Sequence, residues 1–235
     1  MKAVILAGGA GTRMRPLTYV MPKCLLPVGG KPLLERTIGY LSSFGIRDFV
    51  ICVAYLQRQV MDSIRDGSRL GVRVEYATAE APMGTAGQLK TAEAMLPERF
   101  LAMNGDILTD FNVGNLLKEH EARGPVVTIA LKRFEVKVPY GHVAVAEGGA
   151  ITEFKEKPTF SFDANAGIYV MEPKVFSYIP AGRASSLERE TFPAMLAAGE
   201  PVGSYYEDAK WADVGSLTDF ERVNDEVLAG QIEGA

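Results

Sequence analysis

Glycines and positive charges follow one another closely near the start of the chain. Residues 6–18 read LAGGAGTRMRPLT, and Arg13, Arg15 and Lys23 place three cations within eleven residues. Glycine backbones can approach a ligand closely and turn their N–H groups toward phosphate oxygens. This segment therefore predicts a loop that holds a phosphorylated ligand. The alternative is a tight turn between a strand and a helix, with arginines on the surface.

Two common phosphate loops can be tested against this segment. A Walker loop requires GxxxxGK followed by serine or threonine, and the chain contains no such string. The dinucleotide fingerprint GxGxxG begins at Gly9 and Gly11, but its third glycine position holds Met14. The segment fits neither pattern. The Pro-Leu-Thr string and the Pro22-Lys23 pair that follow favour a different phosphate loop over a plain turn.

Two aspartates far apart in the sequence lie at the ends of apolar segments. Asp106 follows the run Leu-Ala-Met-Asn-Gly, and Asp213 lies in the string WADVG. In nucleotide chemistry magnesium uses one or two carboxylates and completes its coordination with phosphate and water. Two aspartates at separate strand ends suit that role, and a helix cap or a turn residue is the alternative for each. We interpret Asp110 as the cap of the helix that follows it.

Two further regions carry residue types suited to a base and a sugar. Residues 80–87, EAPMGTAG, precede a predicted helix, where small residues at the helix N-terminus allow close approach to a base or ribose. An ordinary capped helix start is the alternative there. Glu156 can accept hydrogen bonds from sugar hydroxyls and Lys157 can pair with a sugar phosphate. A charged turn before Pro158 is the alternative for these two residues.

The strings LAGGAGTRMRPLT and PKCLLPVGGKPLLE resemble the signature of sugar-phosphate nucleotidylyltransferases. The strings NGD, PYG, EKP, NAGIY and WADVG match the same family in order, and SLE with the later FP is similar to its mannose-1-phosphate guanylyltransferase branch. The family usually carries a second proline after the lysine, where this chain has Cys24. The resemblance implies a magnesium-dependent enzyme that joins a nucleoside triphosphate to a sugar 1-phosphate and releases pyrophosphate.

The family's site residues transfer onto the matching positions of this chain. The resemblance implies catalytic roles for Arg13 and Lys23 and magnesium ligands in Asp106 and Asp213. The implied nucleotide-binding residues are Leu6, Ala7, Gly8, Gly9, Gly11, Thr12, Arg13, Glu80, Gly84 and Thr85. The implied sugar-phosphate-binding residues are Gly141, Glu156, Lys157 and Asn165. His120 and His142 lie in no catalytic or metal-binding spacing.

The substrates are predicted from the resemblance alone. The form PxGTAG preceded by glutamate favours a guanylyltransferase acting on mannose 1-phosphate or a similar sugar. A thymidylyl- or uridylyltransferase acting on glucose 1-phosphate or another hexose 1-phosphate is the alternative. A catalytically silent nucleotide- or sugar-sensing domain is the alternative from another class, although such proteins usually lose the aspartates or the lysine. The strings FKEKP and NAGIYV disfavour a cytidylyltransferase for a non-sugar alcohol phosphate.

The apolar pattern predicts the elements that must position these residues. Strands are expected at residues 2–6, 48–54, 72–76 and 100–103, with helices at 32–44, 56–65 and 85–95 between them. This alternation is typical of a doubly wound, mostly parallel α/β sheet of Rossmann-like type. After about residue 125 the strands 126–131, 142–146, 151–154 and 166–170 follow with few helices between them, and helices are expected at 173–178, 186–198 and 217–228. We therefore expect one domain, residues 1–235. Its nucleotide-binding half is expected at about 1–124 and a smaller β-rich acceptor half at 125–235. We expect no additional β-helical domain.

Composition restricts the class of partner. With 25 Lys and Arg against 29 Asp and Glu, the net charge of −4 gives no basic excess for nucleic-acid binding. The opening apolar run, residues 3–7, is too short for a signal peptide or a membrane span, so a cytoplasmic location without membrane contact is expected. Cys24 and Cys52 have no CxxC partner, which argues against a zinc site or a disulfide. Homo-oligomerisation is left open by the sequence.

Overall fold

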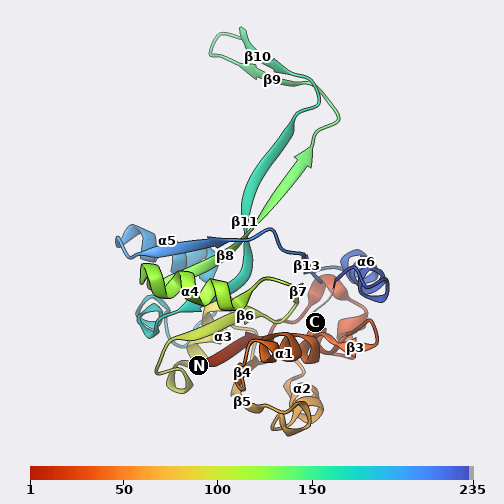
Figure 1. Cartoon of the computed structure of the whole chain (residues 1–235), viewed down its shortest axis with the longest axis vertical. Coiled ribbons are helices and arrows are strands. Elements are labelled where there is room, and N and C mark those ends of the chain that lie inside the picture. The colour runs from red at the N-terminus through yellow and green to blue at the C-terminus, as the bar shows by residue number, and fades with distance from the viewer. Residues whose placement is uncertain (233–235) are drawn as a thin grey trace.

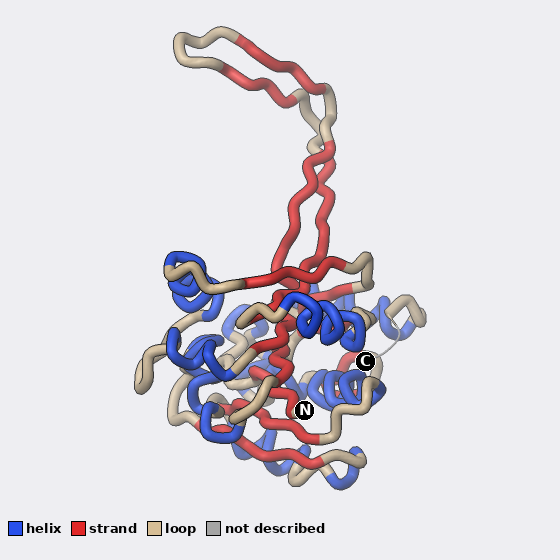
Figure 2. The backbone as a smooth tube through the Cα atoms, turned by 60° about the vertical axis from the view of Figure 1, so that its left-hand side comes forward, coloured by secondary structure: helices blue, strands red, loops and turns tan. Residues whose placement is uncertain are grey.

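A rounded body carries a long two-stranded ribbon that projects from one side (Figures 1 and 2). The computed structural model describes residues 1–232. The strands are β1 (Lys2–Leu6), β2 (Pro27–Val28), β3 (Lys31–Pro32), β4 (Asp48–Val53), β5 (Arg73–Thr78), β6 (Phe100–Asn104), β7 (Ile107–Thr109), β8 (Val127–Lys137), β9 (His142–Val145), β10 (Ile151–Lys155), β11 (Thr159–Met171), β12 (Val202–Tyr206) and β13 (Trp211–Asp213). The α-helices are α1 (Leu33–Ser43), α2 (Gln57–Ile64), α3 (Gly84–Thr91), α4 (Val113–Arg123), α5 (Phe192–Ala197) and α6 (Leu217–Leu228). None of the helices in residues 1–232 combines the length and the apolarity needed to cross a membrane.

The central sheet has seven strands in the order β12-β8-β11-β6-β1-β4-β5. All neighbouring strands run parallel except β11, which is antiparallel to both β8 and β6. The predicted α/β class with a mostly parallel central sheet is confirmed. Strands β8, β11 and β12 of the predicted acceptor half extend the same sheet as the nucleotide half, so one hydrogen-bonded layer runs through both.

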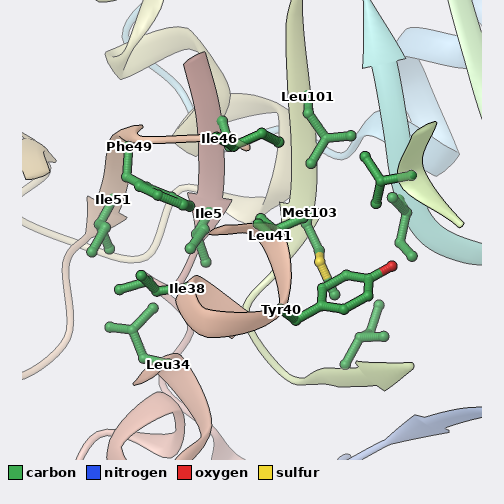
Figure 3. Packing of buried hydrophobic residues seen from close by; sticks show 14 of the residues in the cluster. Ile5, Leu34, Ile38, Tyr40, Leu41, Ile46, Phe49, Ile51, Leu101 and Met103 are labelled. Carbon is green, nitrogen blue, oxygen red and sulfur yellow. The ribbon is translucent and has the colours of Figure 1, made fainter. Parts of the chain in front are cut away.

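The apolar runs form strands because both faces of this sheet are covered by helices. On one face α1 presents Leu34, Ile38 and Leu41 to the buried side chains of β1 and β4 (Figure 3). On the other face α3 and α5 pack on a second buried cluster that includes Leu89 and Met195. Each fully buried Leu, Ile or Phe contributes about 1.5–3 kcal/mol relative to an exposed side chain. The layers therefore hold the carboxyl ends of β1 and β6 in fixed positions.

Several elements differ from the prediction. Strands β8 and β11 are longer than expected, and the short strands β7, β12 and β13 were not predicted. The interpretation of Asp110 as a helix cap is wrong. Asn112 caps α4, since its side chain accepts a hydrogen bond from the backbone N–H of Asn115 at 2.9 Å. The Asp110 carboxylate instead accepts from the backbone N–H of Lys210 at 2.7 Å and ties the chain near β13 to the loop after β7.

The ribbon, residues 132–164, is formed where β8 and β11 continue beyond the body. Their pairing runs outward from Lys132↔Ala164 to Lys137↔Thr159. Beyond it β9 and β10 form an antiparallel hairpin closed at Gly148 and Gly149. Both glycines have positive φ, 93° and 85°, which explains why the predicted turn takes glycine there. The result is a thin double strand with solvent on both faces (Figure 2).

Candidate active site

An open pocket of about 280 Å³ lies at the carboxyl ends of β1 and β6. This is the edge at which open α/β sheets hold ligands, and the volume is close to the lower end of the range for small-molecule sites. The predicted site residues that line it are Leu6, Ala7, Gly9, Gly11, Thr12, Arg13, Lys23, Thr85 and Asp106. Cys24, Gln88, Asn104, Gly105 and Gly215 line it as well. Residues from both ends of the sequence therefore meet at one cavity.

The loop after β1 is shaped by one glycine in a left-handed conformation. Gly11 has φ 58°, and its carbonyl oxygen accepts a hydrogen bond from Thr18 Oγ1 at 2.8 Å. A Cβ at this position would lie 2.9 Å from the Thr18 methyl group, so both the conformation and the space require glycine. The buried side chain of Met14 anchors the far end of the loop. The loop thus stays open toward the pocket, so that a bound ligand would lie close to its backbone.

Gly8 is predicted to bind nucleotide, but it is outside the set of residues that line the pocket. Its backbone N–H donates to Gln88 Oε1 at 2.7 Å. A Cβ on Gly8 would lie 3.0 Å from that same oxygen. Gly8 therefore allows the loop to pack against α3, and it is Gln88 from α3 that borders the cavity.

Lys23 and Asp106 form an ion pair within the pocket. Pro22 precedes a short 3₁₀ turn, Lys23–Leu25, which turns the lysine toward the end of β6. The Nζ atom lies 2.5 Å from Asp106 Oδ2, with 14% of the lysine side chain exposed. A half-buried pair of this kind holds an ammonium group ready for anionic ligands and fixes the carboxylate beside it.

A strand pairing across the sequence brings Asp213 next to the pocket, although its side chain is outside the set that lines it. Strand β13 is antiparallel to β7 with Asp213 opposite Ile107, and the backbone N–H of Val214 donates to the carbonyl of Asp106 at 2.9 Å. Gly215 follows at a crowded position. A Cβ there would lie 2.9 Å from Asp213 Oδ2 and 3.3 Å from an Arg13 nitrogen. The backbone thus brings Asp106, Asp213 and Arg13 into one neighbourhood.

The electrostatics of Asp213 reflect this neighbourhood. Burial raises the pKa of Asp213, and the nearby Asp106 carboxylate raises it further, while Lys23 and Arg13 act in the opposite direction. The Oδ1 atoms of Asp213 and Asn104 are both buried and find no hydrogen-bond partner in residues 1–232. Buried acceptors without donors are costly unless a ligand supplies the missing contact.

These residues fit a magnesium ion bound together with phosphates. Magnesium accepts hard oxygen ligands and requires only one or two carboxylates when phosphate and water complete its coordination. Over residues 1–232 the structure gathers no group of three or more His, Cys, Asp or Glu side chains suited to a metal, so a self-contained protein cage is not formed there. The orphaned Oδ1 of Asp213 is the atom that such an ion would satisfy.

The segment predicted to lie against the base is placed only in part at the pocket. Thr85 lines the cavity, and its hydroxyl donates to Glu188 Oε2 at 2.8 Å. Gly84 does not line it: with φ 68° it packs against Ser185, whose carbonyl oxygen would overlap a Cβ. Glu80 lies outside the lining as well. Gly84 is therefore needed for the packing of α3 against the segment before α5.

Asn165 stands at the foot of the ribbon beside a polar network. Its Nδ2 donates to the hydroxyl of Tyr169 at 2.8 Å, and that hydroxyl donates to Glu188 Oε1 at 3.3 Å. Gly167, two residues on, packs against Asn104 of the pocket lining. The network joins the pocket edge to the strand that leads into the ribbon, and it adds Glu188 to the set of polar groups on this side.

The structure does not bring Gly141, Glu156 and Lys157 to the pocket. All three are exposed and lie on the ribbon, Gly141 just before β9 and the other two just after β10. Within a single chain these three residues lie apart from the pocket beside the glycine loop, and their role in binding the sugar phosphate stays a prediction. The physical reason for this separation is that β8 and β11 continue to pair outward beyond the body and carry the intervening residues away from it.

Some lining residues gave weak signals in the sequence. Asn104 and Gly105 belong to the NGD string and Gly215 to WADVG, so the motifs contain these residues beside the predicted aspartate ligands. Gln88 gave no signal, because a glutamine in a helix is ordinarily a surface residue, whereas here it is 7% exposed. Glu188 lies far from the pocket residues in sequence, and only the fold places it beside Thr85.

Comparison with known proteins identifies the family of this chain. The model of the nucleotidyl transferase family matches residues 2–230. The chain belongs to that family. Among curated nucleotidyl transferases it is 33% identical over 251 residues to UTP–glucose-1-phosphate uridylyltransferase of Synechocystis, covering 99% of this chain and 65% of that protein. It is 36% identical over 234 residues to mannose-1-phosphate guanylyltransferase of Mycobacterium tuberculosis, covering 97% of this chain and 65% of that protein.

The chain thus spans less than two thirds of the length of these nucleotidyl transferases. A solved structure, HddC of Yersinia pseudotuberculosis complexed with GMP-PN, superposes with a TM-score of 0.75. It is 22% identical and covers 96% of this chain and 99% of HddC, which establishes the shared fold. The predicted family and fold are confirmed.

Proposed function

We propose that this chain is a sugar-1-phosphate nucleotidylyltransferase. The observation that carries the proposal is the meeting of Asp106, Arg13 and Lys23 beside a glycine loop in one open pocket, with the Asp213 carboxylate next to them. Carboxylates for a divalent ion, cations for phosphates and an unobstructed backbone loop are what nucleotidyl transfer requires of a protein. The family and the names of the relatives support the same reaction class.

The reaction forms one phosphorus–oxygen bond and breaks another. A phosphate oxygen of the sugar 1-phosphate attacks the α-phosphorus of the nucleoside triphosphate, and the bond between that phosphorus and the oxygen bridging to the β-phosphate breaks. Pyrophosphate leaves with the electron pair, and no proton transfer to the protein is required. Arg13 and Lys23 stabilise the charge on the triphosphate, and the backbone N–H groups near Gly11 orient it.

Asp106 and Asp213 are proposed to hold magnesium, which when bound neutralises phosphate charge and aligns the phosphates for displacement. Lys23 holds the Asp106 carboxylate in place through their ion pair. The Oδ1 atom of Asp213 is buried and lacks a hydrogen-bond donor, and a bound cation would supply the missing contact. Lys157 is proposed to orient the attacking phosphate and Glu156 to accept from the sugar hydroxyls. A cytoplasmic location is proposed because the triphosphate is found there and because both cysteines are free and buried.

The preferred pair of substrates is GTP with mannose 1-phosphate. The string PMGTAG and the similarity to mannose-1-phosphate guanylyltransferase support this choice. UTP with glucose 1-phosphate is the second candidate, supported by the similarity to the Synechocystis uridylyltransferase. Both substrate pairs would use the same phosphate site. The residues near Thr85 and Gln88 would distinguish guanine from uracil.

A pyrophosphate-release assay with the purified chain tests the proposal. Each of the five common triphosphates is combined with mannose 1-phosphate and with glucose 1-phosphate, with and without magnesium. We expect the fastest release with GTP and mannose 1-phosphate, loss of release after chelation by EDTA, and recovery when magnesium is added back. Tight nucleotide binding by calorimetry without pyrophosphate release from any pair would identify a silent sensing domain and reject the enzyme.

A further inference from the structure

The ribbon exposes apolar side chains that no part of the body covers. Tyr140 is 74%, Ile151 66% and Phe154 64% exposed, and Val136, Val145 and Phe162 are exposed as well. A two-stranded ribbon is at best marginally stable alone in water. Exposed apolar groups gathered on one element are typical of a surface that packs against another molecule.

Contacts at its base fix the direction in which the ribbon leaves the body. The Phe134 ring meets Trp211 edge-on with centroids 5.7 Å apart, and the Arg133 guanidinium lies 5.2 Å from the centre of the Tyr206 ring. Lys132 donates to the carbonyl of Ala209 at 2.6 Å. These contacts hold the first residues of the ribbon against β12 and β13, so the strands point away from the body.

Apart from these contacts with the body, the two strands of the ribbon contact each other. Arg133 pairs with Asp163, Phe134 stacks on Phe162, and His142 meets Phe160 with ring centroids 5.2 Å apart. The six residue pairs from Lys132↔Ala164 to Lys137↔Thr159 extend about 20 Å at 3.3 Å per residue, and the β9–β10 hairpin adds to that reach. The ribbon extends well beyond the body (Figure 1).

The pocket lacks positive charge for a second phosphorylated substrate. Its cations Arg13 and Lys23 face two carboxylates, and Lys23 is already paired with Asp106. A triphosphate and a sugar phosphate together bring far more negative charge than these groups and one divalent ion can neutralise. An exposed cation from elsewhere would complement this charge, and Lys157 on the ribbon is such a cation.

The backbone at Lys157 is held in an uncommon conformation. Its φ is 46°, in the left-handed region that costs a non-glycine residue about 1–2 kcal/mol. Residues held in this region cluster at ligand sites, where surrounding structure maintains them. The turn presents Glu156 and Lys157 at the outer part of the ribbon, next to the exposed Phe154.

We propose that two copies of this chain exchange their ribbons, each supplying Glu156 and Lys157 to the pocket of the other. The proposal rests on the proposed function, because it concerns the acceptor side of the same site. Exchange of an identical element between copies forms a closed symmetric dimer and covers both ribbons at once. Lys157 of the partner's ribbon carries the positive charge that the pocket lacks, which favours a second copy over an unrelated protein.

The size of the protein in solution provides the first test. Light scattering coupled to gel filtration is expected to give a dimer. The double variant Val145→Ser/Ile151→Ser, which removes an exposed cross-strand pair of the ribbon, is expected to give a monomer. The exposed turn variant Glu147→Gln is the matched control and stays dimeric. A wild-type monomer, or a dimer that the double variant leaves intact, overturns the exchange whether or not the protein is an enzyme.

Mixing two inactive variants provides the decisive test. Asp106→Asn disables the body and Lys157→Ala disables the ribbon. After the two are co-refolded or co-expressed in equal amounts, half of the dimers combine one copy of each, and one site in each of these has an intact body and an intact ribbon. We expect about a quarter of the wild-type rate of pyrophosphate release, against the residual rates of the separate variants. An active wild type with no recovery in the mixture shows that each chain completes its own site.

Failure of the proposed function gives a different pattern. A wild-type protein that releases no pyrophosphate with any substrate pair rejects the enzyme, and the size measurements then decide the exchange alone. Activity in a wild-type monomer retains the enzyme and rejects the exchange. Circular dichroism of every variant confirms that the sheet and helices are intact.

Discussion

The pocket and the ribbon are built by opposite physical means. In the pocket each functional side chain is fixed by neighbours from distant parts of the chain, as with Lys23 beside Asp106 and Asp213 on a strand that pairs with β7. The ribbon is fixed only at its base, and its outer residues pair with one another and face solvent. This difference supports the proposal that one polypeptide completes the phosphate side of a site, while the ribbon of a second copy completes the acceptor side.

The largest expected effect is at the carboxylates. Asp106→Asn and Asp213→Asn each remove a charge from the pocket and are expected to lower kcat at least about 100-fold. Since burial raises the pKa of Asp213, the charged form is disfavoured in the folded state, and at neutral pH Asp213→Asn should keep or raise the melting temperature. Asp225→Asn, on α6, is the matched control. Kinetics and calorimetry check both outcomes, and near-normal turnover in both pocket variants would remove the metal assignment.

The next effect tests the ribbon as the acceptor side. Lys157→Ala is expected to lower kcat/KM for the sugar 1-phosphate about 10- to 100-fold, because one charge-assisted contact to phosphate contributes about 1.5–3 kcal/mol. The KM for the triphosphate should stay unchanged. Lys137→Ala, an exposed lysine elsewhere on the ribbon, is the control. Equal losses in the two variants would mean that the ribbon acts through its overall charge and not through a defined contact.

A third prediction compares two glycines with positive φ. Gly84 faces the backbone of Ser185, so Gly84→Ala is expected to lower the free energy of unfolding by about 3 kcal/mol through strain and overlap. At Gly149, near the ribbon tip, an added Cβ would meet no atom within 4 Å, so Gly149→Ala should cost about 1 kcal/mol from the backbone alone. Urea unfolding measures both. A larger loss at Gly149 would show that the ribbon is more tightly packed than the body.

The smallest expected effect is a pH dependence of the folding stability of the body. His120 is fully buried between Thr128 and Glu172, and burial lowers its pKa, although the bond to Glu172 acts in the opposite direction. The unfolded chain therefore binds a proton more readily, and stability is lost as the pH falls below the ordinary histidine pKa of about 6.5. His120→Gln should flatten the fall in melting temperature between about pH 7 and pH 5.5. His142→Gln on the ribbon is the control, and an equal flattening there would assign the slope to the ribbon.

The body could be predicted from sequence because its signals are local. The buried runs of β1, β4 and β6 are apolar along most of their length, and the helices between them have one apolar face. The glycine loop was recognisable since residues 6–18 combine glycines with cations in one continuous string. Local patterns of this kind do not depend on what lies beside them in space.

The remaining features depend on contacts between distant segments. Strand β13 has only three residues and forms because β7 offers it a partner, so no periodicity could identify it. Asn112 replaces Asp110 as the cap because Asp110 bonds to Lys210 about a hundred residues away. The direction of the ribbon is set by Phe134 against Trp211 and by Arg133 against Tyr206, and the sequence of β8 does not contain that information.

The pairing of β7 with β13 also bears on how the protein is made. A ribosome releases the glycine loop, Lys23 and Asp106 well before Asp213, and β7 lacks its neighbour until residues 211–213 emerge. A nascent or prematurely terminated chain would then bind a nucleoside triphosphate without catalysing nucleotidyl transfer. The proposed catalytic site would then be completed only late in translation, because the order of the strands places β13 near the end of the chain.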